Sequence, residues 1–224
     1  TWGWRGNSVD IPTDCPQRDE RMGWTGDAEV FCPTSMFLTN AQAFWRSWMQ
    51  SMRDNQDPDG AIPDIIPNMN GKFHAHSPGW MDAAIIIPWS VYLHTSDTSI
   101  LADNYEMMEK LVAWYRSQSV NGLLPNIKGY GDWLQPYPQP PAPGAGKNSA
   151  QKGDTPFPLL GAAFYAHDAQ ILADTAKVLG RTDDENKYGQ EAASERAAFV
   201  KAYFDANGKL QNSPETQTAY DLAI

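Results

Sequence analysis

The residues best suited to chemistry lie in one stretch, Asp14 to Phe31, which reads DCPQRDERMGWTGDAEVF. Prolines and glycines interrupt its first part, 14–26, which is therefore predicted to be a loop. Carboxylates crowded among arginines have pKa values that are pushed apart, which suits one as a proton donor and others as fixed anions. A solvated surface loop is the ordinary alternative, but it does not need a tryptophan between two glycines. The charged and aromatic residues are Asp14, Arg18, Asp19, Glu20, Arg21, Trp24 and Asp27.

Composition and charge narrow the choice of partner. The 224 residues are 42% hydrophobic and 12% aromatic, which is typical of a globular domain or part of a larger one. The formal net charge of −10 disfavours nucleic acid and anionic membrane, because both need clustered lysine and arginine. Nine tryptophans suit stacking on the C–H face of a sugar, although most tryptophans are simply core residues. A neutral substrate handled by carboxylates fits this balance best.

The sequence predicts neither a metal site nor a cofactor. Segment 55–60, NQDPDG, matches the first half of a calcium loop, but Ile66 stands where that loop needs a glutamate, so a plain turn is favoured. His74 and His76 form an H-x-H pair without an evident third ligand, and we interpret them as loop histidines.

The sequence does not determine the cellular compartment of the protein. The two cysteines, Cys15 and Cys32, lack C-x-x-C spacing and demand neither an oxidising nor a reducing environment. No eighteen-residue apolar run and no signal-peptide pattern occurs in the sequence. Secreted, periplasmic and cytoplasmic locations all remain possible.

Apolar periodicity predicts an all-α fold. Six helices are expected in three antiparallel pairs, with short connections inside the pairs and long loops between them. A Pro/Gly-rich segment, 136–156, is expected to be an excursion from the second long loop. Segment 1–13 is expected to be an extended lead-in, and 216–224 the beginning of another helix. The six helices are predicted near 27–39, 41–54, 80–95, 98–117, 157–179 and 183–204, with caps at Asp27, at Thr155 and at Thr182, the last in a capping box with Glu185.

Four segments together resemble glycoside hydrolase family 78, the inverting α-L-rhamnosidases. They are DCPQRDERMGWTGDA (14–28), DPDGAIPDIIP (57–67), SPGWMDAAIIIPW (77–89) and GDWLQP (131–136), and they occur in the family's order. The resemblance covers most of the chain, and the first motif is long enough to be specific. It implies an (α/α)6 barrel, of which residues 1–224 would form roughly the N-terminal half, with the rest of the same domain as the missing partner.

The resemblance also implies roles for the acids of the loop. Glu20 matches the general acid, although some members have a segment one residue shorter, so Asp19 competes for this role. Asp14 and Asp27 match acids that hold the sugar hydroxyls. Arg18 is expected to orient those carboxylates, with an ordinary salt bridge as the alternative.

Three tryptophans and two further acids complete the implied site. Trp24, Trp80 and Trp133 could wall a subsite for rhamnose, which presents a methyl group and an apolar face, although a single tryptophan is more often a core residue than a ligand contact. Asp82 and Asp132 match positions that border the pocket.

The water-activating base that the family implies is a glutamate far downstream, and it is expected beyond Ile224. We therefore expect an enzyme that releases terminal rhamnose, with this chain lacking its base. One alternative is a truncated, catalytically silent half-domain with weak carbohydrate binding. Another is a different (α/α)6 carbohydrate-active enzyme, such as a polysaccharide lyase, which the acidic loop and net charge disfavour. The late glutamates Glu185, Glu191, Glu195 and Glu215 lack the tryptophan-rich context of the base.

Overall fold

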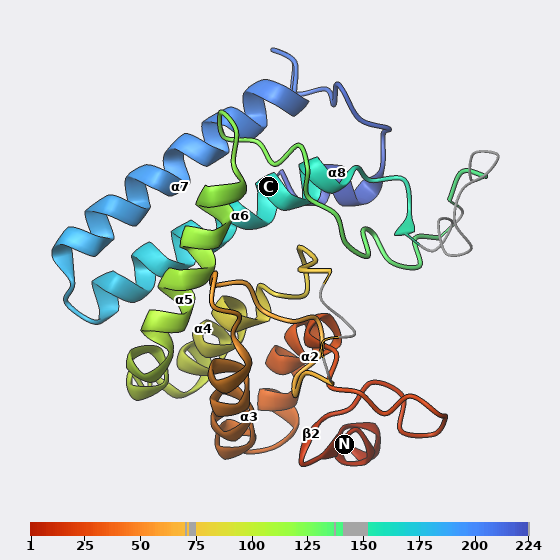
Figure 1. The fold of residues 1–224 in the computed structure, drawn as a ribbon, viewed down its shortest axis with the longest axis vertical. Helices are drawn as coiled ribbons and strands as arrows, with labels where there is room; N and C mark the ends of the chain where they lie inside the picture. Colours follow the sequence, from red (N-terminus) through yellow and green to blue (C-terminus); the bar gives the residue numbers. More distant parts are fainter. Residues whose placement is uncertain (70, 72–74, 137, 141–151, 224) are drawn as a thin grey trace.

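The computed structural model describes residues 1–69, 71, 75–136, 138–140 and 152–223, and the regular secondary structure in them is helical apart from one tiny hairpin (Figure 1). This confirms the predicted all-α class. The long helices match their predicted ranges closely, the largest difference being the start of α4, expected at 80 and found at Ala83. The helices are α1 (Trp2–Gly6), α2 (Thr25–Leu38), α3 (Gln42–Asn55), α4 (Ala83–Thr95), α5 (Ser99–Gln118), α6 (Phe157–Val178), α7 (Thr182–Tyr203) and α8 (Gln217–Asp221), and the hairpin strands are β1 (Ser8–Val9) and β2 (Ile11–Pro12).

The six long helices form two layers. Helix α4 packs between α2 and α6 in one layer, and α3 and α5 lie in front of it, with α7 against α6 (Figure 1). Short turns join α2 to α3, α4 to α5 and α6 to α7, whereas long segments join one pair to the next. This alternation is what part of a ring of helical hairpins requires, because each inner helix must contact the inner helices on both sides.

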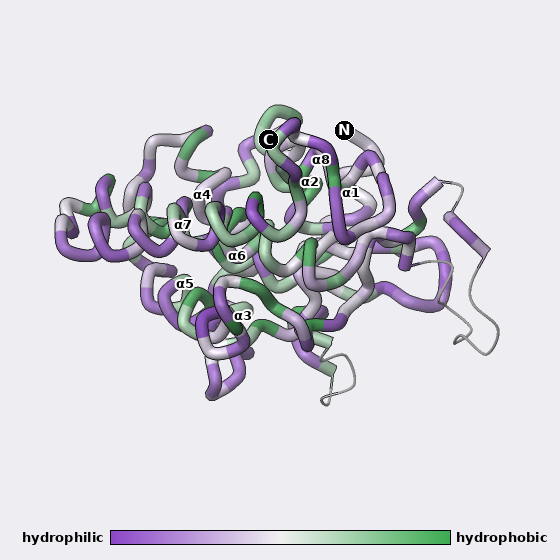
Figure 2. Tube along the Cα trace, turned by 90° about the horizontal axis from the view of Figure 1, so that it is seen from above, coloured by the Kyte–Doolittle hydropathy of each residue, from purple (hydrophilic) through white to green (hydrophobic). Residues whose placement is uncertain are grey.

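Sequence patterns explain the layers. Helix α4, AAIIIPWSVYLHT, is apolar on almost every side, and most of its side chains are buried. Helix α3 instead buries one stripe and exposes its charged face, as a helix in an outer layer should. Figure 2 shows the same contrast, with more hydrophobic trace around α4 and α6 and long hydrophilic stretches around α7. The buried stripe of α3 consists of Trp45, Trp48, Met49 and Met52.

The extended lead-in predicted for 1–13 is wrong in its first part, which forms helix α1. Two glycines disfavour a helix there, each by about 1 kcal/mol. Packing outweighs this cost, because the Trp4 ring stacks on Trp45 at 5.8 Å and its indole N–H donates to Thr39 Oγ1 at 2.8 Å. Helix α1 therefore depends on contacts with residues distant in sequence, which local helix propensity does not take into account.

The predicted caps are also corrected. Helix α2 begins at Thr25, two residues before Asp27, because the Thr25 N–H donates to the Asp64 carbonyl at 2.9 Å. Asp27 still lies in the first turn, where a negative charge is favourable. The capping box at the start of α7 does not form, and Arg181 stands at its N-cap without a side-chain bond. Pro156, rather than Thr155, precedes α6.

Two further expectations concern the ends and the loops. Segment 216–224 does begin a helix, α8, which Thr216 caps by accepting the Ala219 N–H at 3.1 Å. Most of the Pro/Gly-rich segment 136–156 lies outside the described residues, as does His74. Among the helices that the structure describes, none has the length and apolar character needed to cross a bilayer.

Candidate active site

Glu20 occupies a semi-buried place in the loop before α2. Its Oε1 accepts the indole N–H of Trp24 at 2.9 Å, and its Oε2 forms an ion pair with Arg18. The neighbouring Asp19 side chain is fully exposed and contacts only Arg21 among the ion pairs of the described residues, at 3.3 Å. Two adjacent carboxylates thus have very different surroundings. The indole and the guanidinium hold Glu20 in one orientation, whereas Asp19 points to solvent.

Backbone hydrogen bonds fix the loop. The Met22 N–H donates to Asp14 Oδ1 at 2.9 Å, which makes Asp14 a brace of its own loop. The Ile66 N–H donates to the Gly23 carbonyl at 2.9 Å and links the loop to the segment before α4. A Cβ at residue 23 would collide with the Ile66 carbonyl, so glycine is required at this close approach. The loop is therefore held at both ends, as pre-organised catalytic groups need.

Three of the predicted segments meet at one cavity of about 510 Å³, which we call the Trp80 cavity. Gly26 and Asp27 contribute from the start of α2. A Cβ on Gly26 would stand 2.9 Å from both the Trp80 ring and the Gly79 carbonyl, so glycine permits this contact. The cavity receives Pro78, Gly79 and Trp80 from segment 77–89, and Gly131, Asp132 and Trp133 from segment 131–136.

The same cavity has walls that the sequence did not indicate. Leu160 and Phe164 come from α6, and Thr218 from α8, which folds back across the chain (Figure 1). Thr218 donates to Asp132 Oδ2 at 2.6 Å, so this carboxylate is fixed by a residue 86 positions away. No local signal predicts this contact, because it depends on where α8 docks.

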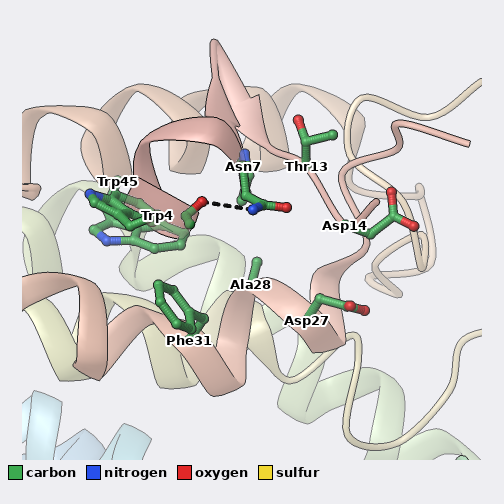
Figure 3. A pocket seen from close by; sticks show the side chains of 10 residues that line it. Trp4, Asn7, Thr13, Asp14, Asp27, Ala28, Phe31 and Trp45 are labelled. Atoms are coloured by element: carbon green, nitrogen blue, oxygen red, sulfur yellow. Dashed lines mark hydrogen bonds between the residues drawn. The ribbon is translucent and has the colours of Figure 1, made fainter. Parts of the chain in front are cut away.

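A second cavity of about 290 Å³, the Asp14 cavity, lies on the other side of Asp27 (Figure 3). Asp14 and Asp27 stand at one end of it, and the rings of Trp4, Phe31 and Trp45 form the other. Asp27 lines both cavities. Phe31, one turn further along α2, also lines both cavities, so these two side chains of α2 separate them.

The environment of Asp27 favours its protonated form. The residue as a whole is exposed, but protein atoms crowd its carboxyl between the two cavities. This burial raises its pKa, and the negative charges of Asp14 and Glu20 raise it further. Its own backbone N–H acts in the opposite direction. A carboxyl at this place, bordering both cavities, can form a hydrogen bond with a sugar hydroxyl.

Asp82 does not reach either cavity in this structure. The residue has 0% exposure, and its carboxylate accepts the Gly79 N–H at 2.6 Å and the Tyr115 hydroxyl at 2.7 Å. The prediction of Asp82 as a substrate contact therefore lacks support from the geometry. Its position beneath the turn that carries Trp80 makes it part of the support of the cavity wall.

Two other buried acids surround Asp82, and the sequence reasoning missed both. Asp168 on α6 has 0% exposure and Glu29 on α2 has 7%. Burial and the charge of Asp82 raise the pKa of each well above its ordinary range. An ionised Asp168 would leave both of its carboxylate oxygens without a hydrogen-bond donor. A protonated Asp168 can instead donate a hydrogen bond to Asp82. We take the protonated form, because it satisfies the most buried polar atoms.

The loop also contains three potential metal donors. Atoms of Asp14, Cys15 and Glu20 lie within 4.8 Å of one another. Burial and the neighbouring Asp14 raise the pKa of the Cys15 thiol, and a protonated thiol is a poor ligand. The Arg18 guanidinium already lies against Glu20. These groups suit a cationic side chain better than a metal ion.

The other predicted loop features are structural. The His76 ring nitrogen Nε2 lies 2.9 Å from Asp57 Oδ2, and its ring meets Trp114 edge-on at 5.7 Å. The predicted turn over 55–60 is present, with Gly60 at φ 102° and Asp59 accepting the Ala61 N–H at 3.1 Å.

Comparison with known proteins identifies the chain. The family model of the bacterial alpha-L-rhamnosidase six-hairpin glycosidase domain matches residues 1–224. The chain belongs to this family. An alpha-L-rhamnosidase of Formosa agariphila is 48% identical over 225 residues, and one of Alteromonas sp. (strain LOR) is 41% identical over 223 residues. Both alignments cover 100% of this chain but only 23% and 24% of those relatives.

Solved α-L-rhamnosidases have the same fold over nearly the whole chain. The Streptomyces avermitilis enzyme, determined in complex with L-rhamnose, superposes with a TM-score of 0.83 at 34% identity, covering 99% of this chain and 19% of its own. The native Aspergillus terreus enzyme superposes with a TM-score of 0.85 at 31% identity, covering 99% and 26%. The chain thus spans about a quarter of the length of its rhamnosidase relatives, and it is part of a six-hairpin domain.

Proposed function

We propose that this rhamnosidase segment supplies the sugar-binding wall and the general acid of a site that hydrolyses terminal α-L-rhamnosides. The observation that carries the proposal is the paired contact of Glu20 with Trp24 and Arg18. An acid catalyst must be held within hydrogen-bond reach of the departing oxygen, and these contacts hold the carboxyl in one orientation. Asp19 has no comparable support, which favours Glu20 over the competing assignment.

The sugar lies, in this proposal, in the Trp80 cavity. Trp80 and Trp133 offer apolar faces to its C–H surface, and Asp27 and Asp132 offer carboxyl groups to its hydroxyls. The anionic groups near the cavity would also stabilise positive charge at the anomeric carbon in the transition state. Asp14 acts on the same sugar from the opposite side of Asp27.

Inversion needs a second carboxylate that activates water on the far face of the sugar. We propose that this base comes from outside residues 1–224. Among the late glutamates, Glu191 pairs with Arg116 at 2.6 Å and Glu215 with Lys209 at 3.2 Å. The 224-residue chain by itself is then the silent half-domain of our alternative hypothesis, with at most weak rhamnose affinity.

The test uses Glu20→Gln in a full-length chain that carries these residues. On an alkyl α-L-rhamnoside, kcat should fall by roughly 10²–10⁴, the usual contribution of a positioned acid. The fall should be smaller on a nitrophenyl rhamnoside, because nitrophenolate leaves without a proton. Asp14→Asn is the matched control and should slow both substrates alike, since Asp14 acts on the sugar. Equal losses for Glu20→Gln on both substrates would remove Glu20 as the acid.

A further inference from the structure

Tyr130 lies at the centre of the aromatic residues of the site. Its ring centroid is 5.3 Å from Trp24, 5.1 Å from Trp80 and 5.8 Å from Trp133. The first and last of these pairs are edge-to-face, at 83° and 84°, and the pair with Trp80 is tilted at 49°. Aromatic rings prefer such arrangements to face-to-face stacking. One side chain therefore contacts all three tryptophans of the site.

The backbone of Tyr130 is fixed as firmly as its ring. Its N–H donates to Ser77 Oγ at 2.9 Å, and the Ser77 N–H donates in turn to Asp64 Oδ1 at 2.9 Å. A Cβ on Gly129 would stand 2.7 Å from the Ser77 Cβ, and Gly131 has φ 73°. The two glycines let the chain approach Ser77 closely and turn away again. This anchors the segment with Trp133 to the segment with Trp80.

The three tryptophans have different tasks. Trp24 donates its indole N–H to Glu20 Oε1 at 2.9 Å, whereas Trp80 and Trp133 line the Trp80 cavity. The ring of Tyr130 contacts Trp24 as well as the two tryptophans of the cavity, although Tyr130 itself lines neither cavity. A shift of its ring would move the partner of the acid and the sugar wall together.

We infer that Tyr130 is a positioning residue of the rhamnoside site. Its ring holds Trp24 in place, and through Trp24 the carboxyl of Glu20. The same ring holds Trp80 and Trp133, which form the proposed wall for the sugar. This inference rests on the proposed function. The hydroxyl has no part in it. The contacts that carry the argument are ring contacts, and these survive replacement by phenylalanine.

The experiment compares Tyr130→Phe with Tyr130→Leu in a full-length chain carrying residues 1–224. Phenylalanine should leave kcat and KM within about twofold. Leucine should lower kcat/KM by about 10- to 100-fold, because misplacement of about 1 Å can cost that much. The loss should divide in a specific way. KM should rise on both an alkyl and a nitrophenyl rhamnoside, and kcat should fall further on the alkyl one, where the acid is needed.

Tyr92→Leu is the matched control. Tyr92 is half-buried on α4 and pairs with Trp89 at 5.3 Å, so it loses a comparable aromatic contact away from both cavities. Its kinetics should equal those of the wild type. A Tyr130→Leu variant that behaves like Tyr92→Leu, or that loses kcat equally on both substrates at unchanged KM, overturns the inference.

Ser77→Ala keeps the test decisive if Tyr130→Leu does not fold. It removes the oxygen that accepts the Tyr130 N–H but keeps the Ser77 N–H that Asp64 accepts. KM should rise about three- to tenfold on both substrates, as expected for one lost hydrogen bond; an unchanged KM would contradict the inference. A wild-type protein that hydrolyses no rhamnoside overturns the proposed function and this inference with it. An active wild type with unchanged variants overturns the inference alone.

Discussion

Asp27 and Glu29 stand two positions apart on the same helix, yet they belong to two contrasting groups of acids. Residues two apart on an α-helix project about 200° from each other. Asp27 thus faces both cavities and the signature loop, while Glu29, which is 7% exposed and touches only the Trp80 cavity, lies beside Asp82 and Asp168. The loop group consists of Asp14, Asp19, Glu20 and Asp27, and the interior group of Glu29, Asp82 and Asp168.

The two groups solve the problem of crowded carboxylates differently. In the loop, arginines accompany the acids: Arg18 pairs with Glu20 and Arg21 with Asp19. In the interior, the bonded partners are the Tyr115 hydroxyl and the Gly79 N–H, both at Asp82. Burying several unpaired charges would be prohibitive, so two of the three interior acids keep their protons. The loop acids border the cavities or solvent, whereas the interior acids form a hydrogen-bonded group in which only Asp82 carries a negative charge.

The largest effect on stability should come from replacing Asp82, the central residue of the interior group. Asp82→Ala leaves the Tyr115 hydroxyl and the Gly79 N–H without their partner at a site with 0% exposure. Each buried unsatisfied donor costs roughly 1–3 kcal/mol, so the free energy of unfolding should fall by about 2–4 kcal/mol. Denaturant unfolding followed by tryptophan fluorescence measures it.

Asp168→Asn is the control for this substitution at pH 5. An amide has nearly the shape of a protonated carboxyl and can still donate to Asp82, so the change should be below about 1 kcal/mol. If Asp168→Asn proved as damaging as Asp82→Ala, Asp168 would be an anion with partners of its own, and the contrast between the groups would fail.

The sequence predicted the helices, because they follow from local periodicity, and it singled out the three motif segments that line the Trp80 cavity. It did not predict which face of α4 and α6 carries an acid inward. Asp82 was expected at the pocket because it matches a family position that borders it, but its carboxylate accepts the Gly79 N–H and lies in the core. Asp168 lies in an apolar helix whose every side seemed buried, so no pattern distinguished it. Tyr130 gained its role only through rings distant in sequence.

The dependence of stability on pH sharpens the comparison. Burial raises the pKa of Asp168 in the folded chain, so the folded state holds a proton that the unfolded state releases above about pH 4. Stability from this group is therefore complete below about pH 4 and declines as pH rises toward the folded pKa, by at most about 1.4 kcal/mol per pH unit. An asparagine at position 168 does not titrate, so the Asp168→Asn variant does not lose stability in this way as pH rises. Relative to wild type, Asp168→Asn should gain stability from pH 4 to pH 7.

Taking the difference between wild type and Asp168→Asn isolates this effect from other groups. His167 acts in the opposite direction, because burial lowers its pKa and its contribution is lost as pH falls. Glu29 and Asp82 titrate in both proteins, and Tyr115 stays protonated because burial raises its pKa. Unfolding curves at half-unit pH steps give the difference. A variant that loses stability relative to wild type as pH rises would show that Asp168 is ionised in the fold.

The smallest effect should come from the most exposed acid of the loop group. The Asp19 side chain is fully exposed and its ion pair with Arg21, at 3.3 Å, is a surface contact that solvent screens. Asp19→Asn should therefore change kcat/KM on either rhamnoside by less than about threefold, in a full-length chain carrying these residues. Glu20 differs from it by one position in sequence and by its bonds to Trp24 and Arg18. If Asp19→Asn instead caused the leaving-group-dependent loss expected of Glu20→Gln, the loop would have to rearrange when substrate binds. The bonds of Glu20 to Trp24 and Arg18 in this structure would then not explain why Glu20, and not Asp19, acts as the acid.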